Sequence, residues 1–161
     1  MSGSDARPSR GRSPAAQDPA WPEYKEAVLE FRVAEPFRIW LAEPLMPADR
    51  KQLRALLPAG AFAVVTPFNP HGRPIPAAEN EARLRREAQE LSARGVRHVR
   101  VDGLSPDGGH CEEGYAMELG REEARALAER WGQSAMFWFD GESFWLVPAA
   151  IDAESVRLPA G

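Results

Sequence analysis

The chain has 161 residues, of which 43% are hydrophobic and 27% are charged, a composition typical of a globular protein with one core. A formal net charge of −4 argues against a dominant role in binding nucleic acid or an anionic membrane, because both need concentrated positive charge. Cys111 is the one cysteine, which excludes an intramolecular disulfide. With no stretch patterned like a signal peptide or a membrane span, we expect a soluble, cytoplasmic protein.

The first twenty residues differ in composition from the rest of the chain. They are nearly all Ser, Gly, Ala, Pro, Arg and Asp, with no aromatic or β-branched side chain, so they bury too little to offset the entropy of ordering. We expect residues 1–20 to form a disordered arm, residues 21–150 a single α+β domain, and residues 151–161 a C-terminal tail.

The first half of the expected domain alternates helices with strands. Helical spacing of apolar residues predicts a short helix over 22–31, and alternation of apolar and polar residues predicts a strand over 37–41. An amphipathic helix is predicted over 47–57. The continuous apolar run at 61–66 indicates a central strand that is covered on both faces.

The second half begins with the longest predicted helix, over 76–94, which is followed by a strand over 96–101 and a turn-rich loop. The remaining predicted elements are a strand at 114–119, a helix at 121–131 and two strands that flank the hairpin signal Asp140-Gly141. This order predicts a mixed sheet of about five to six strands, flanked by helices and ending in a β-hairpin.

No phosphate-binding glycine loop, nucleophile elbow or zinc-binding histidine pair occurs in the sequence, so no reaction class is indicated. The first candidate site residue is Asn69, which follows the buried strand at the edge where open α/β sheets bind ligands. Its amide can both donate and accept hydrogen bonds, and a structural turn before Pro70 is the alternative.

Asn80 and Arg83 lie in the first turns of the longest predicted helix. Asn80 precedes Leu84 by four residues and so belongs to the buried stripe, where an amide needs either a ligand or a structural partner. Arg83 suits an anionic ligand, with a surface ion pair to Glu79 or Glu87 as the alternative.

The run from His110 to Glu113 contains side chains that can ligate metals. Adjacent strand residues point to opposite faces, so we expect no metal site there. Glu113 is a weak catalytic candidate, as an inward general base or hydrogen-bond acceptor at the start of a strand, with an exposed glutamate as the alternative. Gln133, after the last helix, is a further candidate ligand-binding residue, with structural hydrogen bonding as its alternative.

Four motifs follow one another along the chain: V-V-T-P-F-N-P, E-N-E-A-R, P-D-G-G-H-C-E-E-G and W-G-Q-S-A-M-F-W. Together they resemble the bacterial family called domain of unknown function 3293, over about residues 22–148. The resemblance points to Asn69, Pro70, Glu79, Asn80, Arg83, Glu112, Glu113, Gly132 and Gln133, and it implies no assigned reaction. The chain departs from the family pattern at Gly114, where Ser is usual, and at His110, where an aromatic residue is common. A serine-based mechanism would lack its nucleophile here.

We therefore expect a small-molecule-binding domain whose polar pocket is lined by Asn69, Asn80, Arg83, Glu113 and Gln133 and takes a small polar or anionic ligand. The alternative is a non-catalytic protein-interaction or regulatory module, with the outward aromatic residues of the hairpin as its surface. Neither nucleic acid nor a membrane is an expected partner. The sequence identifies no cofactor and no protein partner, and it leaves open whether the protein is an enzyme.

Overall fold

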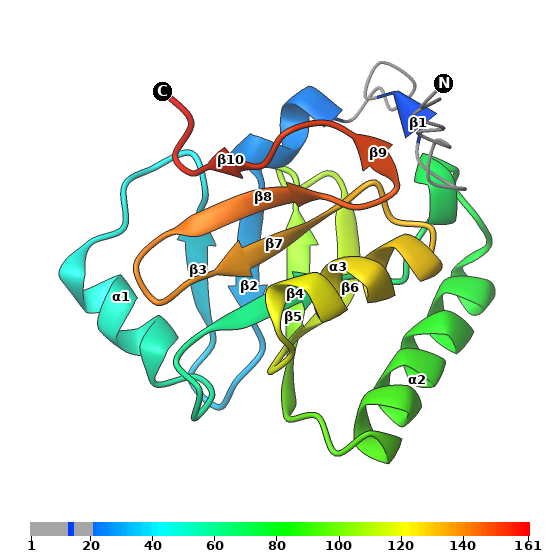
Figure 1. The fold of residues 1–161 in the computed structure, drawn as a ribbon, viewed down its shortest axis with the longest axis horizontal. Coiled ribbons are helices and arrows are strands. Elements are labelled where there is room, and N and C mark those ends of the chain that lie inside the picture. The colour runs from blue at the N-terminus through cyan, green and yellow to red at the C-terminus, as the bar shows by residue number, and fades with distance from the viewer. Residues whose placement is uncertain (1–12, 15–20) are drawn as a thin grey trace, which may run out of the picture.

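The computed structural model describes Ser13, Pro14 and residues 21–161, in which helices pack against one curved antiparallel sheet (Figure 1). The sheet has eight strands in the order β10-β8-β7-β4-β6-β5-β2-β3. In chain order the elements are β1 (Ser13–Pro14), η2 (Trp21–Glu26), β2 (Val28–Phe31), β3 (Phe37–Trp40), α1 (Pro47–Arg54), β4 (Phe62–Val65), η3 (Pro70–Gly72), α2 (Ala77–Ala93), β5 (His98–Leu104), β6 (Cys111–Met117), α3 (Arg121–Arg130), β7 (Ala135–Phe139), β8 (Phe144–Pro148), β9 (Ile151–Asp152) and β10 (Val156–Arg157). The α+β class is confirmed. The sheet is larger than the five or six strands predicted, and it is antiparallel instead of mixed.

The α2 and α3 crossovers each pass over one strand of the antiparallel sheet. Helix α2 connects β4 to β5, and these two strands are separated in the sheet by β6, which runs antiparallel to both. Helix α3 connects β6 to β7, which lie on either side of β4. A strand–helix–strand order in the sequence therefore produces no adjacent parallel strands within this sheet.

The segment predicted as a first helix instead contains a short 3-10 helix and then strand β2. This strand pairs with β3 on one side and with β5 on the other. Leu29 and Phe31 are fully buried in the core, while Glu30, between them, is ion-paired on the opposite face. Over so few residues the same apolar positions fit both the helical period and the alternation of a strand. Pairing with two neighbouring strands makes this segment a strand.

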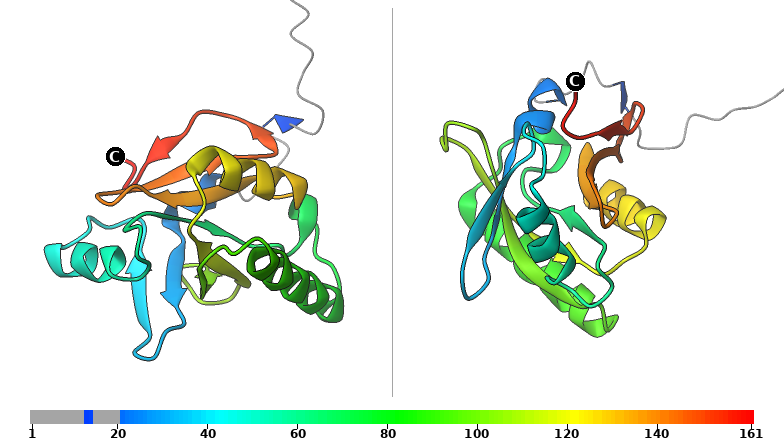
Figure 2. Two further views of the ribbon diagram at one scale, coloured as in Figure 1. Left: turned by 60° about the horizontal axis from the view of Figure 1, so that its bottom comes forward. Right: turned by 90° about the vertical axis from the view of Figure 1, so that its left-hand side faces the viewer.

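The sheet curls into a half-barrel, and its concave face encloses the main core (Figure 2). Phe62 of β4 lies centrally, with its ring centroid 5.2 Å from that of Phe139 and 6.0 Å from that of Phe31. Leu53 of α1 and Leu57, shortly after this helix, belong to the same cluster. The curvature thus brings strands from both ends of the sheet onto one set of aromatic rings.

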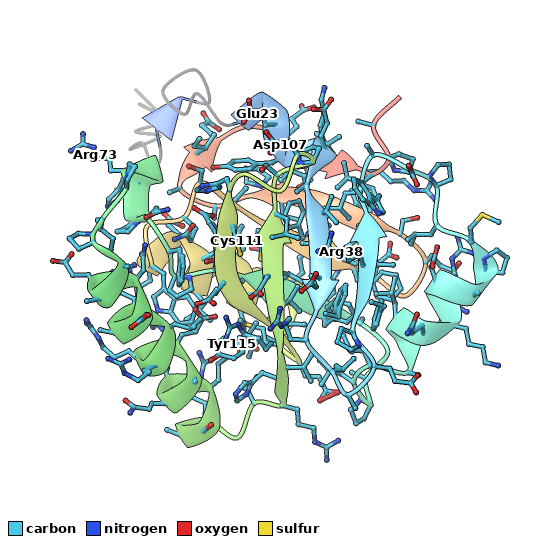
Figure 3. All side chains as sticks on the ribbon, turned by 180° about the vertical axis from the view of Figure 1, so that it is seen from behind. Glu23, Arg38, Arg73, Asp107, Cys111 and Tyr115 are labelled. Atoms are coloured by element: carbon cyan, nitrogen blue, oxygen red, sulfur yellow. The ribbon has the colours of Figure 1, made fainter. Side chains whose placement is uncertain are left out.

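Two helices cover the convex face over β4, β6 and β7. Leu91 of α2 and Leu127 of α3 form a second apolar cluster there with Val65. The neighbouring outer face of β2, β3 and β5 carries charged side chains, which are seen from behind in Figure 3. On it, Arg38 Nε donates to Glu30 Oε2 at 2.7 Å. The two sides of the sheet therefore have different surroundings.

The predicted hairpin is present as β7 and β8, with a loop in place of the two-residue turn. Phe139 pairs with Phe144, so Asp140 through Ser143 form the connection. Asp140 Oδ1 accepts hydrogen bonds of 2.8 Å from the backbone N–H groups of Glu142 and Ser143. The aspartate side chain thereby closes the loop.

Residues 151–161, expected to be a tail, take part in the fold. Strand β10 pairs Val156 with Leu146 of β8, and Leu158 is buried in the main core. Of the expected disordered arm, residues 1–12 and 15–20 lie outside the described residues. Ser13 and Pro14 pair in parallel with β9. No helix in the described part of the chain is long and apolar enough to cross a membrane.

Candidate functional site

One end of the half-barrel contains a cavity of about 760 Å³. Its apolar wall includes Leu29, Val64 and Phe137, from three different strands. Further lining residues come from η2, from β5, β6 and the loop between them, from the segment between β4 and α2, and from the residues after α3. Small-molecule sites are typically concave spaces of this size with mainly apolar walls.

The cavity exists because small residues occupy the inner face of β5 and β6. The strand register pairs Gly103 with Glu112 and Gly114 with Val101, so two of these inward positions carry no side chain. A Cβ at Gly114 would overlap the carbonyl oxygen of Val65, so the close approach of β4 requires glycine there. A Cβ at Gly103 would lie 3.7 Å from the Glu112 carbonyl oxygen, an ordinary contact. Gly103 therefore leaves space that a side chain can fill.

Of the two adjacent glutamates, Glu112 lines the cavity and Glu113 does not. Glu113 is paired in register with Asp102 and forms an ion pair with Arg100 on the outer face. Arg100 Nε also donates to Asp102 Oδ1 at 3.1 Å. The prediction that Glu113 points inward is wrong, because strand alternation places it on the face opposite to buried Gly114.

Asn69 connects the start of α2 to the cavity. Its backbone N–H donates to Asn80 Oδ1 at 2.9 Å, and its Oδ1 accepts from Asn80 Nδ2, also at 2.9 Å. The Asn69 backbone has φ 47°, in the left-handed region that asparagine tolerates better than most residues. Asn69 Nδ2 donates to Glu112 Oε1 at 3.2 Å. The two amides therefore orient the carboxylate inside the cavity.

Arg83 of α2 and Gln133, after α3, both donate hydrogen bonds to the segment between β4 and α2. Arg83 donates from Nε to the Pro67 carbonyl oxygen and from Nη2 to that of Trp131, both at 2.6 Å. Gln133 Nε2 donates to the Phe68 carbonyl oxygen at 2.9 Å. The segment after β4 is thus tied to α2 and to the residues that follow α3.

Four of the five candidate residues taken from the sequence therefore meet on the segment between β4 and α2. Asn69 and Gln133 line the cavity, whereas Asn80 and Arg83 hold the segment without lining it. Because two carbonyl oxygens already occupy the Arg83 guanidinium, an anionic ligand would have to compete with both for it. The structural alternatives considered for Asn80 and Arg83 match these contacts.

Gly132 allows the segment after β4 to lie against the end of α3. Its φ is 76°, and a Cβ there would lie 3.0 Å from Pro70 Cβ and 3.3 Å from the His71 ring. The His71 backbone N–H donates to the Gly132 carbonyl oxygen at 2.7 Å. Both the backbone conformation and the close contact therefore require glycine.

Carboxylates gather around the cavity. The acidic residues that line it are Glu23, Glu26, Asp107 and Glu112, and among its described lining residues there is no lysine or arginine. Figure 3 shows Glu23 near Asp107 at one end of the molecule, with Arg73 projecting away from it. The ionisable side chains of the lining are therefore mostly acidic, and His110 is the one lining residue among those described that can carry a positive charge.

Hydrogen bonds from the Ser105 hydroxyl and the Gly109 N–H lower the pKa of Asp107 below its ordinary value, so this carboxylate is ionised at neutral pH. His110 Nε2 lies 3.4 Å from Glu112 Oε1. Within the described residues, no three His, Cys, Asp or Glu side chains are grouped so as to hold a metal ion.

The sequence interpretation did not include the carboxylates at the mouth of the cavity. Glu23 and Asp107 are far apart in the chain, and only the pairing of β2 with β5 brings their neighbours together. Glu112, by contrast, was among the residues to which the family resemblance points, and it also has a local signal in the sequence. It alternates with Gly114 and Ala116, whose small size is typical of a crowded inner face.

A buried carboxyl group lies on α2, outside the cavity. Glu87 is 1% exposed, and neither of its carboxylate oxygens has a hydrogen-bond partner among the described residues. Burial raises the pKa of Glu87 well above its ordinary value, with nearby Glu90 adding to the shift and Arg83 opposing it. Glu87 is therefore a neutral acid over a wider pH range than an exposed glutamate.

No curated protein and no solved structure matches the chain. The model of the family described as Protein of unknown function (DUF3293) matches residues 65–136. This stretch runs from the end of β4 into β7 and contains Asn69, Asn80, Arg83, Glu112 and Gln133. The match confirms the resemblance predicted from the motifs. Over this stretch, which supplies Asn69, Glu112 and Gln133 to the cavity, the chain is similar to the DUF3293 family.

Proposed function

We propose that the protein is a small-molecule-binding domain whose ligand occupies the cavity at the end of the half-barrel. The observation that carries the proposal is a cavity of about 760 Å³ that combines an apolar wall with the polar side chains of Asn69, Glu112 and Gln133. An apolar wall supplies binding energy, and a few fixed polar groups orient the ligand.

The polar side of the cavity is organised before any ligand arrives. Asn80, Arg83 and Gln133 donate or accept the hydrogen bonds that hold the segment after β4. A site that is already ordered loses less conformational entropy on binding, and this favours affinity. Catalysis is not part of the proposal, although Glu112 is the carboxylate that a bound molecule would meet inside the cavity.

A thermal-shift screen with the full chain against a chemically varied set of small molecules tests the proposal. A ligand present at about 100 times its dissociation constant raises the stability by about 2.7 kcal/mol. Gly103→Val fills the space opposite Glu112 and should abolish the shift without lowering the melting temperature of the free protein. Glu113→Gln, on the outer face, should leave the shift unchanged. Binding that survives Gly103→Val would refute the proposed site.

The alternative function, a protein-interaction module, has less support from the hairpin. Trp138 and Trp145 are partly buried against the second apolar cluster. Trp145 Nε1 also donates to Asp140 Oδ2 at 2.9 Å, and the Arg121 guanidinium lies 5.8 Å from its ring centroid. The outward aromatic residues of the hairpin are therefore partly covered, which leaves little exposed apolar surface of the kind that marks an interface.

A further inference from the structure

We infer that the cavity binds a cationic amphiphile, meaning a small molecule with an apolar body and a positively charged nitrogen group. This inference rests on the proposed function and names the ligand class for the same cavity. A cationic ligand replaces the anionic ligand that was expected from Arg83 in the sequence.

The ionisable side chains that line the cavity are mostly acidic. Four carboxylates line the cavity, and its described lining residues include neither lysine nor arginine. The one imidazole in this lining, that of His110, lies 3.4 Å from Glu112 Oε1 and is mostly exposed, so the acidic groups outnumber it. A concave site that has charges of one sign and low-dielectric apolar walls concentrates the electric field and attracts ions of the opposite charge. An anionic ligand would enter against this field without a guanidinium or ammonium group to compensate it.

Glu112 places one of these carboxylates inside the cavity. It stands on the inner face of β6, with its side chain 25% exposed, and Asn69 Nδ2 donates to its Oε1 at 3.2 Å. The residue paired with it across the strands is Gly103, which adds no side chain to the space beside the carboxylate. A hydrogen bond between a carboxylate and a charged nitrogen donor is stronger than one between neutral groups.

The apolar wall of the cavity determines the chemistry of the rest of the ligand. Leu29, Val64 and Phe137 line the cavity together with Val101 and Leu146. These side chains favour an aliphatic or aromatic body that leaves water on binding. A small, fully hydrated cation would gain nothing from this wall, so the two parts of the lining together indicate an amphiphile.

A matched series of probes tests this ligand class. Phenylbutylamine, phenylbutanol and phenylpentanoate share one apolar body and carry a cationic, a neutral and an anionic head group. We would titrate each into the full chain at low ionic strength and follow backbone amide signals by NMR. We expect the amine to bind roughly 10- to 100-fold more tightly than the carboxylate, and added salt to weaken the amine selectively.

Adjacent glutamates on opposite faces provide a matched pair of variants. Glu112→Gln should lower the affinity for the amine by about tenfold and leave the affinity for the alcohol unchanged. The variant amide oxygen can still accept from Asn69, so the fold should be retained. Glu113→Gln removes the same charge one residue later, on the outer face, and should change neither affinity.

The outcomes separate the ligand class from the site. Equal or tighter binding of the carboxylate, or an amine affinity that Glu112→Gln does not change, would overturn the cationic class. If the alcohol then still bound and Gly103→Val abolished that binding, the cavity would stand as the site of a different ligand. If none of the three probes bound, the cationic class would be refuted, and the wider screen would decide the proposed function.

Discussion

Asn69 and Asn80 exchange two hydrogen bonds of 2.9 Å, one through the Asn69 backbone N–H and one through the Asn80 side-chain amide. By this exchange a buried residue of α2 fixes a loop residue in the left-handed conformation, and the Asn69 amide then reaches Glu112. The polar side of the cavity therefore depends on a contact that lies outside it.

Asn80→Ala should lower the free energy of unfolding by about 2 kcal/mol, because the Asn69 N–H and amide oxygen both lose their buried partner. Urea denaturation measures this change. Glu81→Ala, at the next and exposed position, should change stability by no more than about 0.5 kcal/mol. An equally small effect of Asn80→Ala would contradict the structural role.

Arg83→Ala should lower the free energy of unfolding by about 2–3 kcal/mol, since its charged donors bond to the carbonyl oxygens of Pro67 and Trp131. Arg83→Lys should recover only part of this loss, because one ammonium group cannot reproduce a planar fork across two carbonyls. Hydrogen exchange of the segment between β4 and α2 should accelerate in both variants. Hydrogen-exchange protection at the wild-type level in this segment would argue against the role of Arg83 in holding it.

Gly114→Ser, which introduces the residue usual in the family, should destabilise this chain by about 2 kcal/mol or more. Its Cβ would overlap the Val65 carbonyl oxygen, and β4 would have to move. Gly103→Ala is the matched control, because its Cβ would make only an ordinary contact at 3.7 Å. We expect that variant to be neutral or more stable by up to about 1 kcal/mol, as measured by chemical denaturation.

Glu87→Leu should raise the stability at neutral pH by about 1–3 kcal/mol, because it removes a carboxyl group buried without a partner. The raised pKa means that the folded protein binds this proton more tightly than the unfolded chain does. Stability contributed by Glu87 is therefore fully present below the ordinary pKa of 4.5 and is lost as the pH rises toward the raised value.

Unfolding at a series of pH values above 4.5 checks this expectation for Glu87. The Leu variant should lose the part of the pH dependence that this carboxyl causes. Glu79→Leu, at an exposed position of the same helix, should keep the wild-type pH profile. A Glu87→Leu protein with an unchanged profile would show that the group titrates normally.

Elements with a strong local pattern were predictable from the sequence. The apolar run around Phe62–Val65 forms a fully buried strand, and α2 and α3 begin and end within two residues of the predicted bounds. Val28–Phe31 was not predictable in this way, because so short a strand is defined by its pairing with β3 and β5. The prediction of a tail at residues 151–161 failed for the same reason, because Leu158 is buried by residues that are distant in the sequence.

The candidate site was predictable as a set of positions and less so as a geometry. Asn69 and Gln133 reach the cavity, as expected for polar residues at strand ends. The contacts of Asn80 and Arg83 depend on how α2 packs, which no local pattern contains. Glu113 was assigned to the wrong face of the sheet. The inward-facing positions of this strand are marked only by the small residues Gly114 and Ala116, and an error of one residue in the alternation exchanges the two faces.

The strand order has a consequence for synthesis on the ribosome. The hairpin of β2 and β3 emerges early, but its other neighbour is β5, whose Val101 pairs with Phe31. The neighbours of β4 are β6 and β7, which are synthesised later still. Until those partners leave the exit tunnel, Leu29, Phe31 and Phe62 remain exposed to solvent and to chaperones. The nascent chain therefore completes its sheet late, when the C-terminal third has been made.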